Sequence, residues 1–359
     1  MMISSLLSSV FLLYLVLRSV RLFGARRNRE RVVVLGTGVG ARKLAAVVEA
    51  AAPFCSVMGF VAEENAPDPA LLSVTLPRPL LGNLPELKAI IDSVQPARIV
   101  VALGDPRRPL SIYSLLECGA SGVVIETSVQ AYERLKGQLA IESMTPSYLL
   151  FSGLFCGSIR TRPRQEAIAR TVSVMVALVG LIIAAPLILI VATLIKLESS
   201  GPALFVQERI GLYGKAFKLL KFRTTEVSKQ TSYERAADNA DRITRVGKWV
   251  RKFWLDELLR FINILRGDMN LVGPRPHPVS NYELFAKNIP YYGLRGSVRP
   301  GLTGWAQLRN GYANNLEQET EKMRYDLYYI KNRSLWLDLR IILETLKGCS
   351  PWAKGQPSG

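Results

Sequence analysis

Residues 31–52, RVVVLGTGVGARKLAAVVEAAA, predict the fold class of the first part of the chain. A short apolar run of strand type leads into a turn with glycines at 36, 38 and 40, and an apolar run of helical length follows. This order is the first half of a βαβ unit, in which the next strand lies parallel to the first. We therefore expect an α/β domain built on a parallel sheet.

The sequence downstream repeats the same alternation. Further strands are expected at 56–62, 98–103 and 122–125, and helices at 84–94 and 110–118. Strands that alternate with helices in this way are typical of doubly wound folds. We expect a small Rossmann-like domain over residues 31–147.

The glycines Gly36, Gly38 and Gly40 raise the question of a bound nucleotide. A glycine-rich turn before a helix brings backbone N–H groups close to a pyrophosphate. The spacing is GxGxG rather than GxGxxG, however, and the nearest acidic residues, Glu63 and Glu64, are typical of a surface loop. We favour a tight turn in a non-catalytic domain, with nucleotide binding as the alternative.

The N-terminal sequence predicts a membrane anchor. Residues 1–17 carry no charge, and arginines follow at 18, 21, 26, 27 and 29. A signal peptide has its positive charge before the apolar run, whereas this sequence has it after. We expect an anchor over residues 1–23, with its arginines in the cytoplasm.

A second uncharged run, TVSVMVALVGLIIAAPLILIVATLI, begins at Thr171 after a basic linker over 148–170. Twenty-five helical residues reach ~37 Å, enough to cross a bilayer. Pro186 removes a backbone hydrogen bond in the middle of the run, and both flanks are positively charged. We therefore expect a re-entrant helical hairpin over 171–196 rather than a span.

Composition limits the classes of partner. The net charge is +17, from 46 Lys+Arg and 29 Asp+Glu. Such a surplus is typical of proteins that bind nucleic acid, anionic lipid or phosphorylated substrates. The basic residues flank apolar runs without a stacking-aromatic motif, which argues against nucleic acid. Four scattered cysteines with no CxxC pair favour a reducing cytoplasm.

Residues 251–276, RKFWLDELLRFINILRGDMNLVGPRP, contain the chemistry. They place Asp256 and Glu257 on a short apolar helix, followed by a Gly-Pro-Arg-Pro turn. In isolation such a pair is usually an exposed part of a helix surface. Among so many cations, two carboxylates indicate a metal and a phosphorylated substrate. Because neighbours on a helix diverge by ~100°, the two acids are expected to have different roles.

An amphipathic helix is expected near the C-terminus, within residues 316–346. Leu335, Trp336, Leu339 and Leu343 share one face of it. Two alternatives remain open at this point: the face lies in the membrane interface, or it packs into a core.

Six motifs together resemble the monotopic bacterial sugar transferases, the polyprenyl-phosphate phosphoglycosyl transferases. They are GPALFVQERIG (201–211), KFRT (221–224), LDEL (255–258), RGDMNLVGPRP (266–276), RPGLTGWAQ (299–307) and YDLYYIKNRSLWLDL (325–339). The resemblance covers about half the chain, from the second apolar run to Lys347. The N-terminal part resembles the longer members, which add a nucleotide-fold, CoA-binding-like domain.

The resemblance implies a sugar-1-phosphate transferase with a two-step reaction. Asp256 attacks the β-phosphorus of a UDP-sugar, UMP leaves, and undecaprenyl (polyprenyl) phosphate takes the phosphosugar from the enzyme. Glu257 acts beside Mg²⁺, so the implied metal ligands are Asp256 and Glu257. The product starts an exopolysaccharide, capsule or O-antigen-type glycan.

Further site residues follow from the same resemblance. The implied phosphate-binding cations are Lys221, Arg223, Arg251, Arg275 and Arg299. Pro186 falls on the family's helix-breaking proline. The sequence departs from the family pattern at Trp254, where a small hydroxyl residue is usual, and at Leu259, where proline is usual. Neither departure removes a reacting group.

The resemblance also implies where the protein works. We expect the bacterial inner (cytoplasmic) membrane, with a mostly helical catalytic domain, 197–349, facing the cytoplasm. The expected partners are the UDP-sugar, undecaprenyl phosphate and membrane lipids, with a homodimer and other glycan-assembly enzymes as further expectations. The alternative is a catalytically inert membrane scaffold or nucleotide sensor that acts through the Rossmann-like domain.

Overall fold

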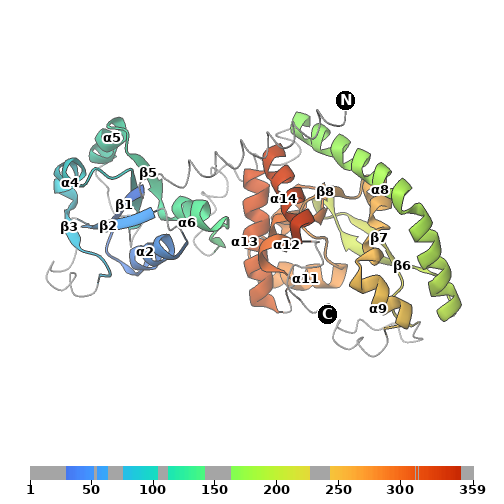
Figure 1. The fold of residues 1–359 in the computed structure, drawn as a ribbon. Coiled ribbons are helices and arrows are strands. Elements are labelled where there is room, and N and C mark those ends of the chain that lie inside the picture. The colour runs from blue at the N-terminus through green and yellow to red at the C-terminus, as the bar shows by residue number, and fades with distance from the viewer. Residues whose placement is uncertain are drawn as a thin grey trace, which may run out of the picture. The chain divides into compact units, whose positions relative to one another are not determined.

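The computed structural model describes residues 30–51, 55–63, 76–103, 112–141, 163–226, 243–311, 313 and 315–348. The chain divides into two compact units after Ala140, and each is described by itself. Figure 1 shows both units. The expected anchor over residues 1–23 lies outside the described residues.

The first unit is an α/β fold with a parallel five-stranded sheet, as expected. Its strands run in the order β3-β2-β1-β4-β5. They are β1 (Glu30–Leu35), β2 (Cys55–Ala62), β3 (Leu80–Asn83), β4 (Arg98–Val101) and β5 (Val124–Thr127), with the helices α2 (Val39–Ala51), α4 (Leu87–Val94), α5 (Ile112–Ala120) and α6 (Ser128–Lys136), and a 3₁₀ turn η1 (Leu84–Glu86). The sequence did not predict β3 or α6.

The sheet is covered on both faces because β1 is apolar at every buried position. Val32 and Val34 pack in one cluster with α2 and α6, whereas Val33 and Leu35 pack in a second cluster with α4. Alternate residues of a strand point to opposite faces, so two cores form. At the end of β1, Gly36 has φ +120° and lies against the carbonyl of Ala102, where a Cβ would clash. The turn therefore requires glycine for close strand packing.

The second unit combines one very long helix with small sheets and shorter helices (Figure 1). Its helices are α8 (Pro163–Glu198), α9 (Arg245–Lys252), α10 (Arg260–Arg266), α11 (Val279–Asn288), α12 (Trp305–Asn310), α13 (Leu316–Asn332) and α14 (Leu335–Gly348). β6 (Leu204–Ile210) and β7 (Ala216–Phe222) form an antiparallel hairpin, and β8 (Asn270–Val272) pairs in parallel with β9 (Gly301–Thr303). The 3₁₀ turns are η4 (Leu212–Gly214), η6 (Leu255–Glu257) and η7 (Tyr292–Ser297).

Helix α8 has one buried face along its whole length. Its buried residues recur at intervals of three, four or seven positions, at Glu166, Ala169, Ser173, Ala177, Ala184, Val191 and Ile195. Gly180 continues this line against the ring of Phe261. The rest of the helix is apolar and exposed, for example Ile183 at 72% and Leu189 at 68%. By length and composition α8 could cross a membrane, and so little of it is buried that it is not a core helix.

Both ends of α8 are fixed to the same unit. At the first end, Arg170 donates to the carbonyl of Met269 (2.8 Å) and Glu166 pairs with Arg299 and Arg333. At the other end, Glu198 accepts from the backbone N–H groups of Arg245 (2.7 Å) and Val246 (3.0 Å). A carboxylate in this place caps α9 and complements its dipole.

The helix differs from the expected re-entrant hairpin. Figure 1 shows α8 as one continuous arc, and Pro186 lies within it. Pro186 is on the exposed side, where a proline bends a helix without cutting its packed face. The helix also begins at Pro163, inside the expected linker. A proline suits a first helical turn because its missing N–H has no partner there.

The expected amphipathic face near the C-terminus belongs to α14. Leu335, Trp336, Leu339 and Leu343 are 39–71% exposed. This face is therefore not packed into the core of the second unit.

Candidate functional site

The β6–β7 hairpin brings Lys221 to the acidic pair. Lys221 lies on β7 opposite Phe205, while its neighbours Leu220 and Phe222 belong to the core that contains Val191 of α8 and Leu259. Because side chains alternate along a strand, Lys221 points away from that core. This direction leads toward η6, which carries Asp256 and Glu257.

The acidic pair lies in a 3₁₀ turn, not on a helix as expected. α9 ends at Lys252, and Trp254 then takes a left-handed conformation with φ 57°. This break starts η6 in a new direction, so Asp256 and Glu257 stand between two helices. The two acids still diverge, since successive residues of a 3₁₀ turn are ~120° apart.

Glu257 is held by two arginines. Its Oε1 accepts from Arg260 (2.8 Å) and from Arg275 (3.1 Å). Arg260 is almost fully buried, at 1% exposure. Burial acts to raise the pKa of Glu257, but Arg260 and Arg275 outweigh it and the pKa is lowered. Glu257 is therefore a fixed anion at neutral pH.

Asp256 behaves in the opposite way. Burial, and next the charge of Glu257, raise its pKa, although Lys221 and Arg260 act against this shift. Two adjacent carboxylates in a partly buried site repel each other. A bound cation, or a bond between Asp256 and phosphorus, would reduce this repulsion. The two acids thus differ in environment as well as in direction.

The cations of the site outnumber its acids. Burial, followed by repulsion from Arg209, Arg260 and Arg275, lowers the pKa of Lys221 to about 7. Burial and the repulsion of Arg260 and Arg275 lower the pKa of Arg209 to about 9. We call these six residues the acidic-pair site: Asp256, Glu257, Lys221, Arg209, Arg260 and Arg275. Its positive surplus suits a ligand that carries more than one negative charge.

The Gly-Pro-Arg-Pro turn fixes Arg275. A Cβ on Gly273 would clash with the carbonyl of Arg299, and one on Gly301 would clash with the N–H of Gly273. The turns 273–276 and 299–304 therefore pack backbone against backbone, which explains why both are rich in glycine and proline. Arg275 also donates to Gln307 (2.8 Å), so its guanidinium is held from two directions.

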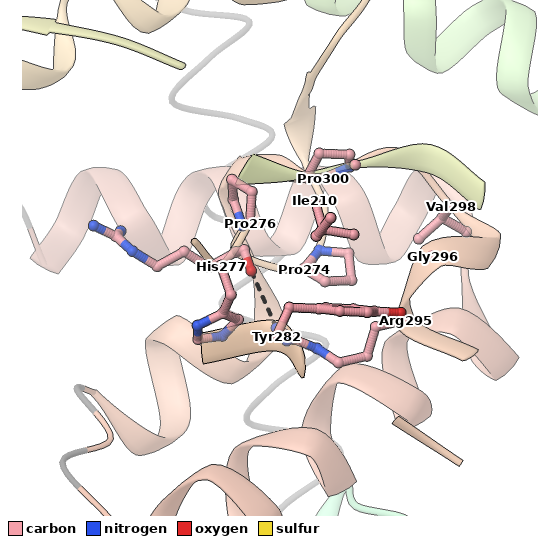
Figure 2. Close-up of a pocket in the computed structure, with 11 residues that line it drawn as sticks. Ile210, Pro274, Pro276, His277, Tyr282, Arg295, Gly296, Val298 and Pro300 are labelled. Carbon is pink, nitrogen blue, oxygen red and sulfur yellow. Dashed lines mark hydrogen bonds between the residues drawn. The ribbon is translucent and has the colours of Figure 1, made fainter. Parts of the chain in front are cut away.

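A group of buried charged and polar side chains holds this turn by its carbonyls. Arg295 donates to the carbonyl of Arg275 (3.1 Å), and Arg209 donates to that of Pro276 (2.6 Å). Figure 2 shows His277, Tyr282 and Arg295 around a small pocket lined by the prolines of the turn. We call the following residues the buried network: His277, Tyr292, Arg295, Glu319, Lys322 and Asp326.

The buried network is internally paired. Glu319, which is 0% exposed, contacts His277 (3.1 Å), Arg295 (3.5 Å) and Lys322 (3.6 Å), and it accepts from the hydroxyl of Tyr292 (2.8 Å). Asp326 pairs with Arg295 (2.7 Å). Burial acts to raise the pKa of Glu319, but the hydrogen bond of His277 and the charge of Arg295 lower it well below its usual range.

His277 is neutral within this network. Burial, and next the charge of Arg295, lower its pKa to about 3. Its ring also packs edge-on against Phe285, with 5.5 Å between ring centroids. A group that is uncharged and enclosed in this way supports the turn rather than exchanging protons with a ligand.

The structure brings four of the expected site residues together: Asp256, Glu257, Lys221 and Arg275. Arg223 instead donates to the carbonyls of Ser199 (3.0 Å) and Ser200 (2.8 Å) at the end of α8. Arg299 pairs with Glu166 near the start of α8. Arg251 donates to the hydroxyl of Thr224 (2.9 Å), beside the strand that carries Lys221.

Sequence reasoning missed Arg209, Arg260 and Gln307. Arg260 follows Glu257 by three positions, which is the spacing of a local ion pair and was a usable signal. Arg209 and Gln307 lie inside quoted motifs, but their roles depend on contacts that cross from one motif to another.

The site offers two carboxylates to a metal. No group of three or more His, Cys, Asp or Glu side chains forms a metal cluster within the described ranges. Mg²⁺ usually binds through one or two carboxylates together with substrate phosphates and water. The oxygen donors of Asp256 and Glu257 fit that pattern, and a cation there would reduce the repulsion between them.

Comparison with known proteins assigns this chain to a family. The family model described as bacterial sugar transferase matches residues 164–350. The chain is 38% identical over 234 residues to the UDP-N-acetylgalactosamine-undecaprenyl-phosphate N-acetylgalactosaminephosphotransferase of Aeromonas hydrophila, covering 65% of this chain and 54% of that protein. It is 33% identical over 270 residues to the UDP-glucose:undecaprenyl-phosphate glucose-1-phosphate transferase of Escherichia coli (strain K12), covering 74% and 57%.

The aligned part thus spans little more than half the length of these two relatives. A shorter relative is covered almost completely: the exopolysaccharide production protein PSS of Rhizobium leguminosarum bv. phaseoli is 38% identical over 184 residues, which are 92% of that protein and 49% of this chain. The family model's range, 164–350, includes the acidic-pair site, the buried network and all of the long helix except its first residue. This chain belongs to the bacterial sugar transferase family.

Proposed function

We propose that the protein transfers a sugar 1-phosphate from a UDP-sugar to undecaprenyl phosphate at the membrane. The observation that carries the proposal is the acidic-pair site, where four cations surround two carboxylates of different environment. A diphosphate donor supplies the negative charge that this site lacks. The names of the relatives describe the same class of donor and acceptor.

The reaction has two steps, with Asp256 as nucleophile. A carboxylate oxygen of Asp256 attacks the β-phosphorus of the donor, and UMP leaves with the bridging oxygen. An oxygen of undecaprenyl phosphate then attacks the same phosphorus and releases Asp256 as a carboxylate. Lys221 and Arg275 bind the phosphate oxygens, while Arg260 holds Glu257 in place.

Mg²⁺ is the expected cofactor, and Asp256 and Glu257 are the residues that would hold it. When bound, it neutralises charge on the diphosphate oxygens. The divergence of the two side chains supports separate roles, with Asp256 toward phosphorus and Glu257 fixed by its arginines.

The protein works at the cytoplasmic face of the bacterial inner membrane, in our proposal. The exposed apolar side of α8 lies in the lipid. Both its ends contact the second unit, so the continuous helix is held against that unit with its apolar side free for lipid. The first unit is a non-catalytic Rossmann-like domain. The product enters exopolysaccharide, capsule or O-antigen-type synthesis, where homodimers and other glycan-assembly enzymes are the expected partners.

The test compares UMP release by the wild type and by Asp256→Asn in lipid nanodiscs. Each receives a panel of UDP-sugars, Mg²⁺ and undecaprenyl phosphate. Glu283→Gln, which changes an exposed acid on α11, is the matched control. We expect Mg²⁺-dependent UMP from the wild type and the control, and none from Asp256→Asn. No UMP from a folded wild type with any donor would favour the inert scaffold or sensor.

A further inference from the structure

Helix α9 carries an unusual exposed surface. Its sequence, RVGKWVRK, has four cations and no acid. Val250 faces the core at 2% exposure, whereas Trp249 is 62% exposed. The packing of the second unit explains the apolar inner side of this helix, but it does not explain the cations and the aromatic ring on its outer side.

Aromatic residues extend this surface past the end of the helix. Trp249 stacks on Phe253 with 5.6 Å between ring centroids, and the Lys252 ammonium lies 5.5 Å from the Trp249 centroid and 5.8 Å from that of Phe253. Phe253 and Trp254 are 54% and 55% exposed. We name Trp249, Lys252, Phe253 and Trp254 the α9 aromatic surface. Rings combined with lysine stems are typical of the zone where lipid head groups meet acyl chains.

The α9 aromatic surface continues the outer side of α8. Val250 of α9 packs in one cluster with Val191 and Ile195 near the end of α8. In the same part of α8, Leu194 and Leu197 are exposed at 44% and 79%. A bilayer that covers this end of α8 therefore reaches the neighbouring helix.

A third exposed tryptophan, on another helix, provides an internal comparison. Trp336 on α14 is 71% exposed, but α14 also carries Asp338 and Glu344. Its charges are mixed, whereas those of α9 are all positive. Only α9 of these two helices has the charge that complements an anionic lipid surface.

We propose that the α9 aromatic surface docks into the head-group region of an anionic bilayer and holds Asp256 at the depth of the acceptor's phosphate. Trp254 directly precedes η6, and its left-handed backbone directs that turn. The docked ring therefore lies two residues from Asp256. This inference rests on the proposed seating of α8 in lipid, and its first test does not require turnover.

The first test measures tryptophan depth in the full chain. Asp256→Asn protein is placed in nanodiscs that contain phosphatidylglycerol, with lipids brominated near the top of the acyl chain as quencher and acrylamide as the aqueous quencher. Trp336 and Trp352 are replaced by Phe, and then either Trp249 or Trp254 as well. The buried Trp305 is kept in every variant as the reference.

We expect the brominated lipid to quench both Trp249 and Trp254, and acrylamide to quench them poorly. The lipid effect should weaken when phosphatidylglycerol is replaced by phosphatidylcholine. Strong quenching by acrylamide alone would overturn the proposal, because the rings would then face water. Protection from both quenchers would also overturn it, since a second copy or another protein would then cover the surface.

The second test separates the ring of Trp254 from its backbone. Asparagine tolerates the left-handed conformation, so Trp254→Asn removes the ring and preserves the turn that carries Asp256. We expect this variant to raise KM for undecaprenyl phosphate by roughly five- to tenfold. KM for the UDP-sugar should stay unchanged, and so should donor-only UMP release. Equal loss with donor and acceptor would show a structural role and would contradict the proposal.

Discussion

The acidic-pair site and the buried network both contact the turn 273–276, yet their charges are balanced differently. The site has two acids, Asp256 and Glu257, against four cations, and burial lowers the pKa of Lys221 to about 7. The network has two acids, Glu319 and Asp326, against two cations, Arg295 and Lys322. The positive surplus of the site agrees with the proposal that it binds an anionic ligand, whereas the charges of the network balance one another. Substitutions in the network should therefore damage the fold, and those in the site should damage activity.

The largest effect on stability is expected from Glu319→Gln. Gln keeps the shape and a hydrogen-bond acceptor for Tyr292, but it removes the ion pair of the buried Lys322 and leaves Arg295 with Asp326 as its remaining acid. Breaking a buried ion pair from one side costs about 3–5 kcal/mol. We expect a clearly lower thermal midpoint in nanodiscs. Glu321→Gln, which removes a local pair with Arg324, is the control and should change little. An unchanged midpoint for Glu319→Gln would contradict the claim that the paired charges of the buried network stabilise the fold.

Lys221→Met should lower activity without lowering stability. It removes a phosphate-binding charge, so UMP release should fall by about 10²–10³-fold, as for loss of one electrostatic group in an active site. It also removes a partly buried cation from beside Arg209, Arg260 and Arg275. The unfolding midpoint should therefore stay the same or rise. A large loss of stability would show that Lys221 is structural.

The pH dependence of donor binding tests whether the charge of Lys221 contributes to it. The Lys221 charge is present below its pKa of about 7 and is lost as pH rises through that value. KM for the UDP-sugar should therefore increase several-fold between pH 6 and 8.5. Lys221→Arg keeps the charge over this range and should remove the increase. A persistent increase in Lys221→Arg would assign the titration to another group.

The smallest effect concerns His277. Its folded pKa is about 3, below the usual value, so the unfolded chain binds a proton first as pH falls. This contribution to stability is full above the unfolded pKa of ~6.5 and is lost as pH falls toward 3. His277→Gln should therefore show a flatter loss of unfolding midpoint between pH 6.5 and 5 than the wild type. The pH profile of UMP release in this interval should not change.

Local patterns predicted much of the fold. Alternating apolar strands and helices predicted the parallel sheet. The four-residue β3, LLGN, has no strand pattern of its own and depends on its neighbour β2. Pro186 suggested a break in α8, but packing of the opposite face continues through it.

The sequence predicted both acids of the candidate site but only two of its four cations. Asp256, Glu257, Lys221 and Arg275 lie in short motifs, and the fold brings them together. Arg223 and Arg299 lie in equally clear motifs but contact the two ends of α8. The buried network joins segments that are distant in sequence, such as His277 and Glu319. Such contacts leave no local pattern, because any surface acid or base has the same appearance in the sequence.

The most direct test of the proposed mechanism is the mass of the intact protein after exposure to its UDP-sugar and Mg²⁺ without undecaprenyl phosphate. We expect UMP to be released once and the wild type to gain the mass of one phosphosugar, located on Asp256. The adduct should disappear when undecaprenyl phosphate is added, and it should be absent from Asp256→Asn. A phosphosugar adduct in Asp256→Asn, or steady turnover of a wild type that never carries the adduct, would contradict the proposed mechanism.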